Sequence, residues 1–362
     1  MSRTSPLKHV WLDCDPGHDD ATAILLALHS PNINLVGIST VHGNTDAVHT
    51  ALNAARCLYA FAAPSHIRVH AGASKPLTRT VRHDAEIHGI DGLGGVQGLP
   101  SPEAPEVLAR VAVGVPALEA LSRGVRETWK DGNGEKVALV ASGPLTNIAL
   151  FVSTYPELLD GVSRIVFMGG GIGLGNRSSV AEFNILCDPE AAQIVLNAPV
   201  ETVMMPLNVT HQAIVTHPIH SEILTGTPPP SSFTPVSPLP SSTSPLRHTL
   251  STLITFFKDA YRATFNFVDG PPLHDALTIA YIARPDLFEC TRYRVDVELA
   301  GTYTTGETVA DVWDYRKCDD SWGPTGKNCL VALGLDKPVF FAYLLDAIAR
   351  CDAVSPLNLK DK

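Results

Sequence analysis

Short apolar runs alternate with longer segments of helical periodicity through the first 205 residues of the chain. Strands of a parallel sheet are covered on both faces and appear as short apolar runs, whereas amphipathic helices repeat apolar residues every three or four positions. The apolar runs predict strands over residues 9–13, 35–41, 67–70, 137–141, 164–168 and 202–205. The periodic segments predict helices over residues 19–29, 45–60, 103–125, 146–152 and 189–197, with a break or kink at Pro116. These six βα-like units predict an α/β fold with a doubly wound, mostly parallel sheet and helices on both faces.

The second half of the chain is interrupted by a segment of biased composition. Residues 227–245 contain sixteen Pro, Ser or Thr in nineteen positions and no charge, so this segment has too few apolar side chains to bury a core of its own. Helical periodicity predicts helices over residues 246–265 and 274–283, and strands are expected at 295–299 and 308–313. We therefore expect a single domain over residues 1–362, with an insert at about 225–246 and a surface loop at about 316–329.

Composition excludes several classes of protein. Hydrophobic residues make up 45% of the chain and charged residues 18%, which is a globular balance and excludes a disordered scaffold. The formal net charge of −10 argues against nucleic acid as a partner, because binding to phosphate backbones requires clustered positive charge. No apolar run reaches the roughly 18 residues that cross a bilayer, so we expect no membrane association and a cytoplasmic location.

The seven cysteines form no C-x-x-C pair, and free thiols are the expectation. Cys318 and Cys329 flank the predicted surface loop, and a bridge between them stays open for a secreted chain.

The sequence DCDPGHDD places four aspartates directly after the first predicted strand. They are Asp13, Asp15, Asp19 and Asp20. Open α/β sheets bind ligands at the carboxyl ends of their strands. Carboxylates this close together repel one another, and a hard divalent cation with oxygen ligands relieves that repulsion. Helix capping is the alternative, but it accounts for one or two aspartates and not for all four.

Two known acidic loops, the EF-hand and the D-x-D phosphatase motif, differ from this spacing. An EF-hand counted from Asp13 requires Gly at position 18 and Glu at position 24, where the chain has His18 and Ile24. A D-x-D phosphatase would use Asp13 as its nucleophile. It continues with Thr or Val where this chain has Gly17, and it needs a later lysine that ASGPLTN lacks.

Further candidate side chains follow three more predicted strands, lie in a Gly-rich loop or open a predicted helix. The candidates are His42, Asn44, His88, Ser142, Asn147, Met168, Asn176, Glu182, Asn184, His274 and Asp275. The glycines of MGGGIGLGN give no G-x-G-x-x-G frame, because Gly171 and Gly173 require glycine at position 176, which is Asn; a dinucleotide fingerprint is therefore rejected. Amide and carboxylate groups of this kind bind vicinal hydroxyls, so a sugar is a sensible ligand.

DCDPGHDDA, VHGNT, HGIDGLGG, SGPLTNIAL, MGGG…GN…AEFN and LHDA occur in an order and at spacings that resemble the inosine–uridine-preferring nucleoside hydrolases. The resemblance runs from about Val10 to Trp313, in the branch that carries a histidine before the late aspartate. It implies a calcium-dependent enzyme that hydrolyses the N-glycosidic bond of ribonucleosides such as uridine and inosine, giving ribose and free base. It also implies a homodimer or homotetramer.

The resemblance implies a role for each matching position. Ca²⁺ would be bound by the side chains of Asp15, Asp20 and Asp275 and by the backbone carbonyl of Ser142. Asp15 would also accept a proton from the attacking water, and His274 would lie near the leaving base. The remaining positions would contact the ribose: Asp19, Asn44, Glu182 and Asn184 at its hydroxyls, Asn176 and His88 on the 5′ side, and Met168 beneath the ring.

The resemblance leaves the base pocket undefined, so purine or pyrimidine preference stays open, and the Pro/Ser/Thr-rich insert falls where relatives have a segment bordering that pocket. Two alternatives to the enzyme remain: a non-catalytic module that binds nucleosides or ribose, and the D-x-D phosphatase.

Overall fold

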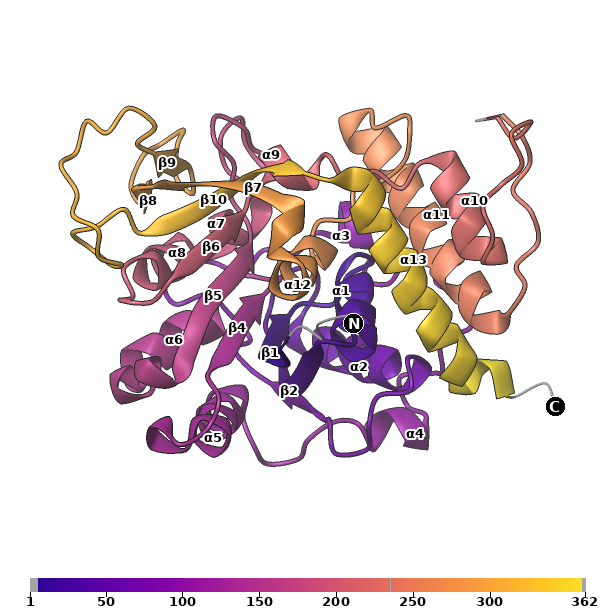
Figure 1. The fold of residues 1–362 in the computed structure, drawn as a ribbon, viewed down its shortest axis with the longest axis horizontal. Helices are drawn as coiled ribbons and strands as arrows, with labels where there is room; N and C mark the ends of the chain where they lie inside the picture. Colours follow the sequence, from indigo (N-terminus) through magenta and orange to yellow (C-terminus); the bar gives the residue numbers. More distant parts are fainter. Residues whose placement is uncertain (1–5, 235, 360–362) are drawn as a thin grey trace.

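Eight strands form one central sheet in the computed structural model, which describes residues 6–234 and 236–359 (Figure 1). The strand order is β3-β2-β1-β4-β5-β6-β10-β7, and β7 alone runs antiparallel to its neighbour in this sheet. The strands are β1 (Lys8–Cys14), β2 (Ile33–Thr40), β3 (Val69–Ala71), β4 (Val137–Ala141), β5 (Val162–Met168), β6 (Thr202–Met205), β7 (Phe288–Tyr293) and β10 (Cys329–Leu335). The first six strands follow the doubly wound order. Strands β1 to β3 are added toward one edge of the sheet and β4 to β6 toward the other, so the switch point lies between β1 and β4.

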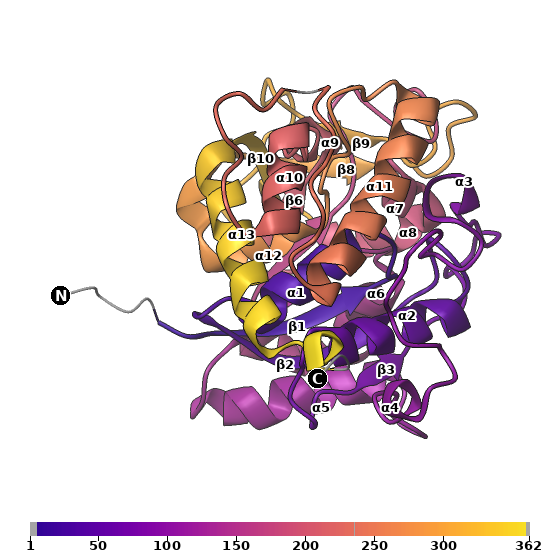
Figure 2. The same cartoon turned by 90° about the vertical axis from the view of Figure 1, so that its right-hand side faces the viewer.

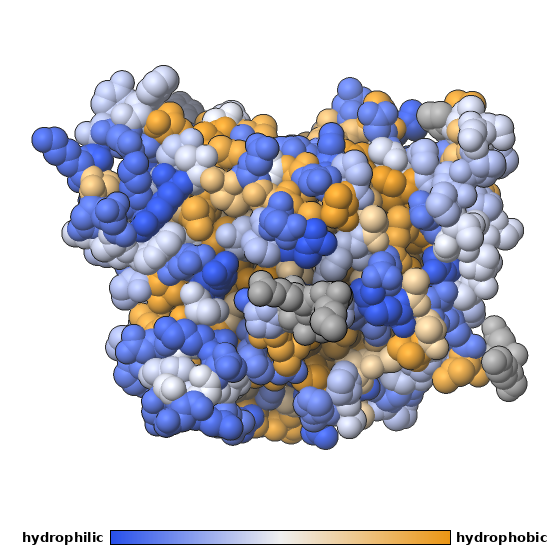
Figure 3. Space-filling model, in the orientation of Figure 1, coloured by the Kyte–Doolittle hydropathy of each residue, from blue (hydrophilic) through white to orange (hydrophobic). Residues whose placement is uncertain are grey.

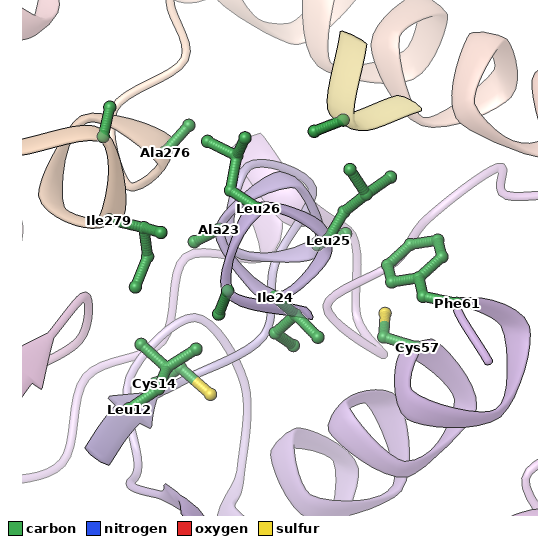
Figure 4. Close-up of a cluster of buried hydrophobic side chains, with 14 of the residues drawn as sticks. Leu12, Cys14, Ala23, Ile24, Leu25, Leu26, Cys57, Phe61, Ala276 and Ile279 are labelled. Carbon is green, nitrogen blue, oxygen red and sulfur yellow. The ribbon is translucent and has the colours of Figure 1, made fainter. Parts of the chain in front are cut away.

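The alternation of side chains along β1 divides the core into two layers. Val10, Leu12 and Cys14 face α1 (Asp20–His29), α2 (Ala47–Ala60), α12 (Ala276–Ala283) and α13 (Lys337–Val354). Trp11 points to the opposite face, which α5 (Ala117–Trp129), α6 (Thr146–Thr154) and α8 (Pro189–Leu196) cover. Figure 4 shows α1 surrounded by apolar side chains, including Leu12 below it and Ile279 of α12 beside it. Because α1 is covered on nearly every side, its first turn is held in a fixed position above the sheet.

The remaining elements lie around this core. The long helix α11 (Pro245–Phe265) packs against α10 (His217–Thr225) and passes above the carboxyl edge of the sheet (Figure 2). β8 (Val295–Val297) and β9 (Thr308–Ala310) form a separate antiparallel ribbon. Short helices occupy the connections: α3 (Ala85–His88), α4 (Pro105–Leu108), α7 (Phe183–Cys187) and α9 (Leu207–Thr210), with 3-10 turns at Lys130–Gly132, Pro156–Gly161, Pro285–Leu287 and Pro356–Leu359.

The predicted fold class is confirmed, and the largest local error concerns residues 103–125. They form two separate helices, α4 and α5, in place of one long helix. The expected break occurs, and Pro116 occupies the N-cap position of α5 without a side-chain capping hydrogen bond. Between them the chain pairs with β3, where Val69 N–H donates to the carbonyl of Arg110 at 2.8 Å and Ala112 N–H donates to that of Val69 at 2.9 Å. This pairing with the sheet outweighs the local helix propensity.

The Pro/Ser/Thr-rich insert joins α10 to α11 and lies against α10. The ring of Phe233 stacks on His217 with 5.0 Å between ring centroids, and Thr243 N–H donates to the carbonyl of Leu224 at 3.0 Å. No described residue of the insert lines the cavity of the candidate site. Figure 3 shows this region in pale shades of intermediate hydropathy at the upper right.

Cys318 and Cys329 carry free thiols, as do the other five cysteines. Within the described residues, no helix has both the length and the apolar character required to cross a bilayer.

Candidate active site

The candidate site lies where the doubly wound sheet changes direction, at the carboxyl ends of β1, β2, β4 and β5. Ligands bind in this crevice in open α/β sheets, because the loops diverge there and leave the strand ends uncovered. A cavity with about 350 Å³ of atom-free space, part of it open to solvent, occupies the crevice. Its lining residues are Asp19, Asn44, Asp84, His88, Ser142, Met168, Asn176, Glu182, Phe183, Asn184, Tyr261, His274 and Asp275.

Three carboxylates converge at one end of this cavity. Asp19, Asp20 and Asp275 each offer an oxygen such that these atoms lie within 4.8 Å of one another, and all three residues are buried. They meet because α1 and α12, far apart in sequence, pack side by side with their N-termini at this edge. Asp19 and Asp275 are the N-cap residues of these helices, yet neither side chain caps its helix. The carboxylates therefore face one another, and helix capping does not explain them.

Asp15 lies beside this group in a close-fitting backbone cradle. One carboxylate oxygen accepts from the backbone N–H of Asn44 at 2.8 Å, while the other, Oδ1, is buried with no hydrogen-bond partner. A Cβ on Gly43 would lie 1.9 Å from Oδ2, and one on Gly143 would lie 2.5 Å from Oδ1. Glycine is thus required on both sides of this carboxyl group, which leaves Oδ1 available for a ligand.

Burial of this acidic group opposes ionisation in the absence of a cation. Desolvation raises the pKa of Asp19 to about 8, with a further contribution from the charge of Asp20. Desolvation also raises the pKa of Asp15 and of Asp275 well above the usual carboxyl range, and the neighbouring aspartates add to both shifts. A divalent cation among these groups would reverse that effect, since opposite charge favours the ionised form.

Ser142 and Asn184 connect β4 to the far wall of the cavity. The Ser142 hydroxyl donates to Asp20 Oδ1 at 2.7 Å, and its carbonyl accepts from Asn184 Nδ2 at 2.8 Å. Glu182 is the N-cap of α7 and accepts from the backbone N–H groups of Asn184, Ile185 and Gly170. Despite these hydrogen bonds, desolvation raises the pKa of Glu182 to about 7. Oxygen and amide groups therefore line the wall opposite the acidic group.

His88 lines the cavity as a neutral ring. Burial lowers its pKa well below the usual histidine range, and the nearby rings and Arg177 act in the same direction. The backbone N–H of His18 donates to His88 Nδ1 at 3.2 Å, so this nitrogen carries a lone pair and Nε2 carries the proton. His88 is therefore a neutral ring whose N–H lies on Nε2.

His274 is held between two hydroxyl groups. Its Nε2 lies 2.6 Å from Tyr261 Oη and its Nδ1 lies 2.8 Å from Thr210 Oγ1. Burial lowers the pKa of His274 well below the usual range, so the ring is neutral near pH 7. Tyr261 reaches it from α11, which also places Phe257 against the same rings.

The structure brings most of the sequence-predicted site residues together, whereas His42 and Asn147 do not line the cavity and bond to Thr146 and Asp13 instead. Ten of them line the cavity, and Asp15 and Asp20 lie directly beneath it. Asp13 does not belong to this acidic group: it is fully buried on the other face of the sheet, where Ser39 Oγ and Asn147 Nδ2 donate to its Oδ1 at 2.5 and 2.8 Å. Three lining residues were not predicted from the sequence: Asp84, Phe183 and Tyr261.

A family model described as inosine-uridine preferring nucleoside hydrolase matches residues 10–342. The chain belongs to this family. The predicted resemblance is therefore confirmed, and the chain is an enzyme of the nucleoside hydrolase class.

Individual nucleoside hydrolases match along almost the whole chain. A probable ribonucleoside hydrolase of Dictyostelium discoideum is 34% identical, with 94% of each chain covered. The pyrimidine-specific ribonucleoside hydrolase RihA of Citrobacter koseri is 38% identical over 94% of this chain and 97% of its own. Among solved structures, the purine-preferring ribonucleoside hydrolase from Gardnerella vaginalis superposes with a TM-score of 0.79 at 28% identity, covering 95% of this chain and 99% of its own.

Proposed function

We propose that this nucleoside hydrolase cleaves the N-glycosidic bond of ribonucleosides, with uridine and inosine as representative substrates, and that it requires Ca²⁺. The observation that carries the proposal is the unpartnered Oδ1 of Asp15 beside the acidic group of Asp19, Asp20 and Asp275. Relatives with opposite base preferences, pyrimidine-specific and purine-preferring, match this chain, so the proposal covers both classes of base.

The donor set fits a calcium ion. Ca²⁺ takes six to eight oxygen ligands from carboxylates, backbone carbonyls and water. Asp15, Asp20 and Asp275 would supply carboxylate oxygens, and the Ser142 carbonyl retains a second lone pair beside the one used by Asn184. When bound, such an ion lowers the pKa of a coordinated water and makes it a nucleophile at neutral pH.

The side chains around the cavity would supply the general base and bind the ribose. Cleavage passes through an oxocarbenium-like state, so water is activated on one face of the sugar while the base departs from the other. Asp15 Oδ1 would accept the proton of the attacking water. Asp19, Asn44, Glu182 and Asn184 would hold the ribose hydroxyls, Asn176 and His88 the 5′ hydroxyl, and Met168 would pack beneath the sugar.

His274 would assist departure of the base. Because the ring is neutral, the proton must come from an N–H or O–H already shared in the hydrogen-bonded group of Thr210, His274 and Tyr261. This arrangement supports a neutral His274 that receives its proton from Tyr261 or Thr210. It does not support an isolated imidazolium as the proton donor.

The two alternatives fit the geometry less well. A D-x-D phosphatase needs Asp13 exposed to substrate, and Asp13 is fully buried and bonded to Ser39 and Asn147. A non-catalytic binding module would not require an unpartnered carboxylate oxygen at Asp15.

Incubation of the purified protein with uridine, inosine, cytidine and nicotinamide riboside, with calcium or with a chelator, tests the proposal. Ribose release that stops with the chelator and returns with Ca²⁺ is expected. Release that is insensitive to the chelator would refute the metal requirement, and no release from any nucleoside would refute the reaction.

A further inference from the structure

A largely buried ion pair joins two loops that contribute residues to the cavity. Arg177, in the connection between β5 and α7, pairs with Asp84, the N-cap residue of α3. The side chains are only 19% and 9% exposed. Asp84 is also fixed at the carboxyl end of β2, because its backbone N–H donates to the carbonyl of Asn44 at 3.1 Å. The pair therefore has a defined position relative to the acidic group.

Arg177 is held in place by more than its charge. Its guanidinium lies 5.7 Å from the ring centroid of Phe183 and 5.5 Å from that of Phe265, and its Nη1 donates to the carbonyl of Asn176 at 2.7 Å. Flat guanidinium groups stack well on aromatic rings, so the arginine is pre-positioned even without its carboxylate partner.

Asp84, but not Arg177, is exposed to the cavity. The described residues that line it include four carboxylates, Asp19, Asp84, Glu182 and Asp275, and neither lysine nor arginine. Asp84 would thus act on an anionic ligand in two ways. It neutralises Arg177, which contacts the lining residues Asn176 and Phe183, and it presents its own negative charge.

The pair is directly bonded to the residues assigned to the 5′ hydroxyl. The carbonyl of Asp84 accepts from the backbone N–H of His88 at 2.9 Å, and the carbonyl of Asn176 accepts from Arg177. A phosphate on the 5′ oxygen of a nucleoside would therefore meet the Asp84–Arg177 pair.

We propose that Asp84 is a specificity-determining residue that excludes nucleoside 5′-monophosphates and restricts the site to uncharged nucleosides. This inference rests on the proposed function. A 5′-phosphate carries a charge of about −1.5 to −2 at pH 7 and binds best to a free guanidinium. Because Arg177 is already paired, the phosphate gains no partner and is repelled by the carboxylate, and such repulsion is an efficient source of selectivity.

The proposal predicts that two variants change the relative affinity for the monophosphate and the nucleoside in opposite directions. The substrate is the nucleoside that releases ribose fastest, and its own 5′-monophosphate is the competing ligand. Asp84→Asn removes the negative charge and frees Arg177, so the inhibition constant of the monophosphate, divided by KM of the nucleoside, is expected to fall at least about tenfold. Arg177→Gln leaves the carboxylate unpaired and is expected to raise the same ratio.

Three further measurements separate charge selection from general damage. The double variant Asp84→Asn/Arg177→Gln is expected to lose the gain of Asp84→Asn. Added salt is expected to weaken monophosphate binding in Asp84→Asn, since screening acts on charge. Glu190→Gln is a matched control, because it breaks the Arg79–Glu190 pair, which contributes no residue to the cavity, and it should leave the ratio unchanged.

An unchanged ratio in folded Asp84→Asn, or in Arg177→Gln if Asp84→Asn does not fold, would overturn the inference while nucleoside hydrolysis by the wild type stands. Failure of the wild type to hydrolyse any nucleoside would instead overturn the proposed function, and this inference with it.

Discussion

The hydroxyl of Tyr261 lies 2.6 Å from Nε2 of His274, although Tyr261 lies on α11 and His274 precedes α12. Both groups are buried, and both line the cavity. Burial raises the pKa of Tyr261 well above its usual value and lowers that of His274, so the proton between them stays on one neutral partner or the other. This contact makes Tyr261 part of the machinery proposed for base departure.

Tyr261→Phe is expected to slow hydrolysis of inosine or uridine by at least about tenfold, equivalent to about 1.4 kcal/mol of transition-state stabilisation. A riboside with a good leaving group needs little protonation and should lose much less. Comparison of kcat/KM for the two substrates checks the prediction. Equal losses on both would mean that Tyr261 only supports the pocket.

Asp15→Asn is expected to remove nearly all activity and leave the fold intact, since the variant keeps the shape of the side chain but cannot accept the proton of water. Loss of a general base typically costs about 10²–10⁴-fold in rate. Steady-state kinetics and circular dichroism measure the two properties. Turnover close to that of the wild type by the folded variant would exclude Asp15 as the base.

Asp13→Ala is the matched control. It leaves the Asn147 amide and the Ser39 hydroxyl without their buried acceptor, which costs about 1–3 kcal/mol of stability. We expect it to unfold at lower denaturant concentration and to keep the activity of the fraction that folds.

Without calcium, the stability of the fold should fall as pH rises. The folded-state pKa of Asp19, about 8, lies above the unfolded value of 3.8, so the folded protein without metal binds an extra proton between these values. Its stability therefore falls as pH rises from about 4 to about 8. Asp15 and Asp275 shift in the same direction and add to the loss.

The proposed calcium ion would bind the ionised carboxylates, so its stabilising effect should grow over the same pH interval. Thermal melts at pH 5 to 8, with chelator or with calcium, measure the difference. An increase in melting temperature on adding calcium that is the same at every pH would contradict this account.

Replacement of residues 228–242 by a short Gly/Ser linker is expected to leave kcat/KM within about threefold of the wild type. Thr243 N–H bonds to the Leu224 carbonyl, so the two ends of the insert already meet and a few residues can bridge them. Ser244 caps α11 and donates to Asp352, and Arg247 pairs with the same carboxylate, so α11 is anchored independently of the insert. A change in the purine-to-pyrimidine ratio would show that the insert reaches the base after all.

The sequence predicted the central sheet and most of the site for one physical reason. Buried parallel strands are continuous apolar runs, and the residues that follow them must gather at one edge, so Asp15, Asn44 and Ser142 could be placed together without coordinates. The late strands β7 and β10 and the helix α13 were not predicted. β7 has its side chains partly exposed, and its antiparallel pairing with β10 depends on residues some forty positions away.

Two of the missed site residues lack a local signal, whereas Phe183 lies within the AEFN motif and could have been included with it. Phe257 and Tyr261 are one helical turn apart on α11, which is the spacing of ordinary core residues. This spacing gives no indication that the Tyr261 hydroxyl lies at the cavity. Asp84 belongs to none of the motifs, and its importance comes from Arg177, which only the folded chain brings to it. The spacing of residues along the sequence cannot predict long-range ion pairs of this kind.

The packing of α1 against α12 has a consequence for biosynthesis. Asp19 and Asp20 leave the ribosome early, but their third partner, Asp275, follows only after most of the polypeptide has been made. A nascent chain cannot assemble the complete acidic group, so binding of the proposed ion would have to await release of the C-terminal region. If the proposal holds, premature termination before Asp275 would yield a product that added calcium does not rescue.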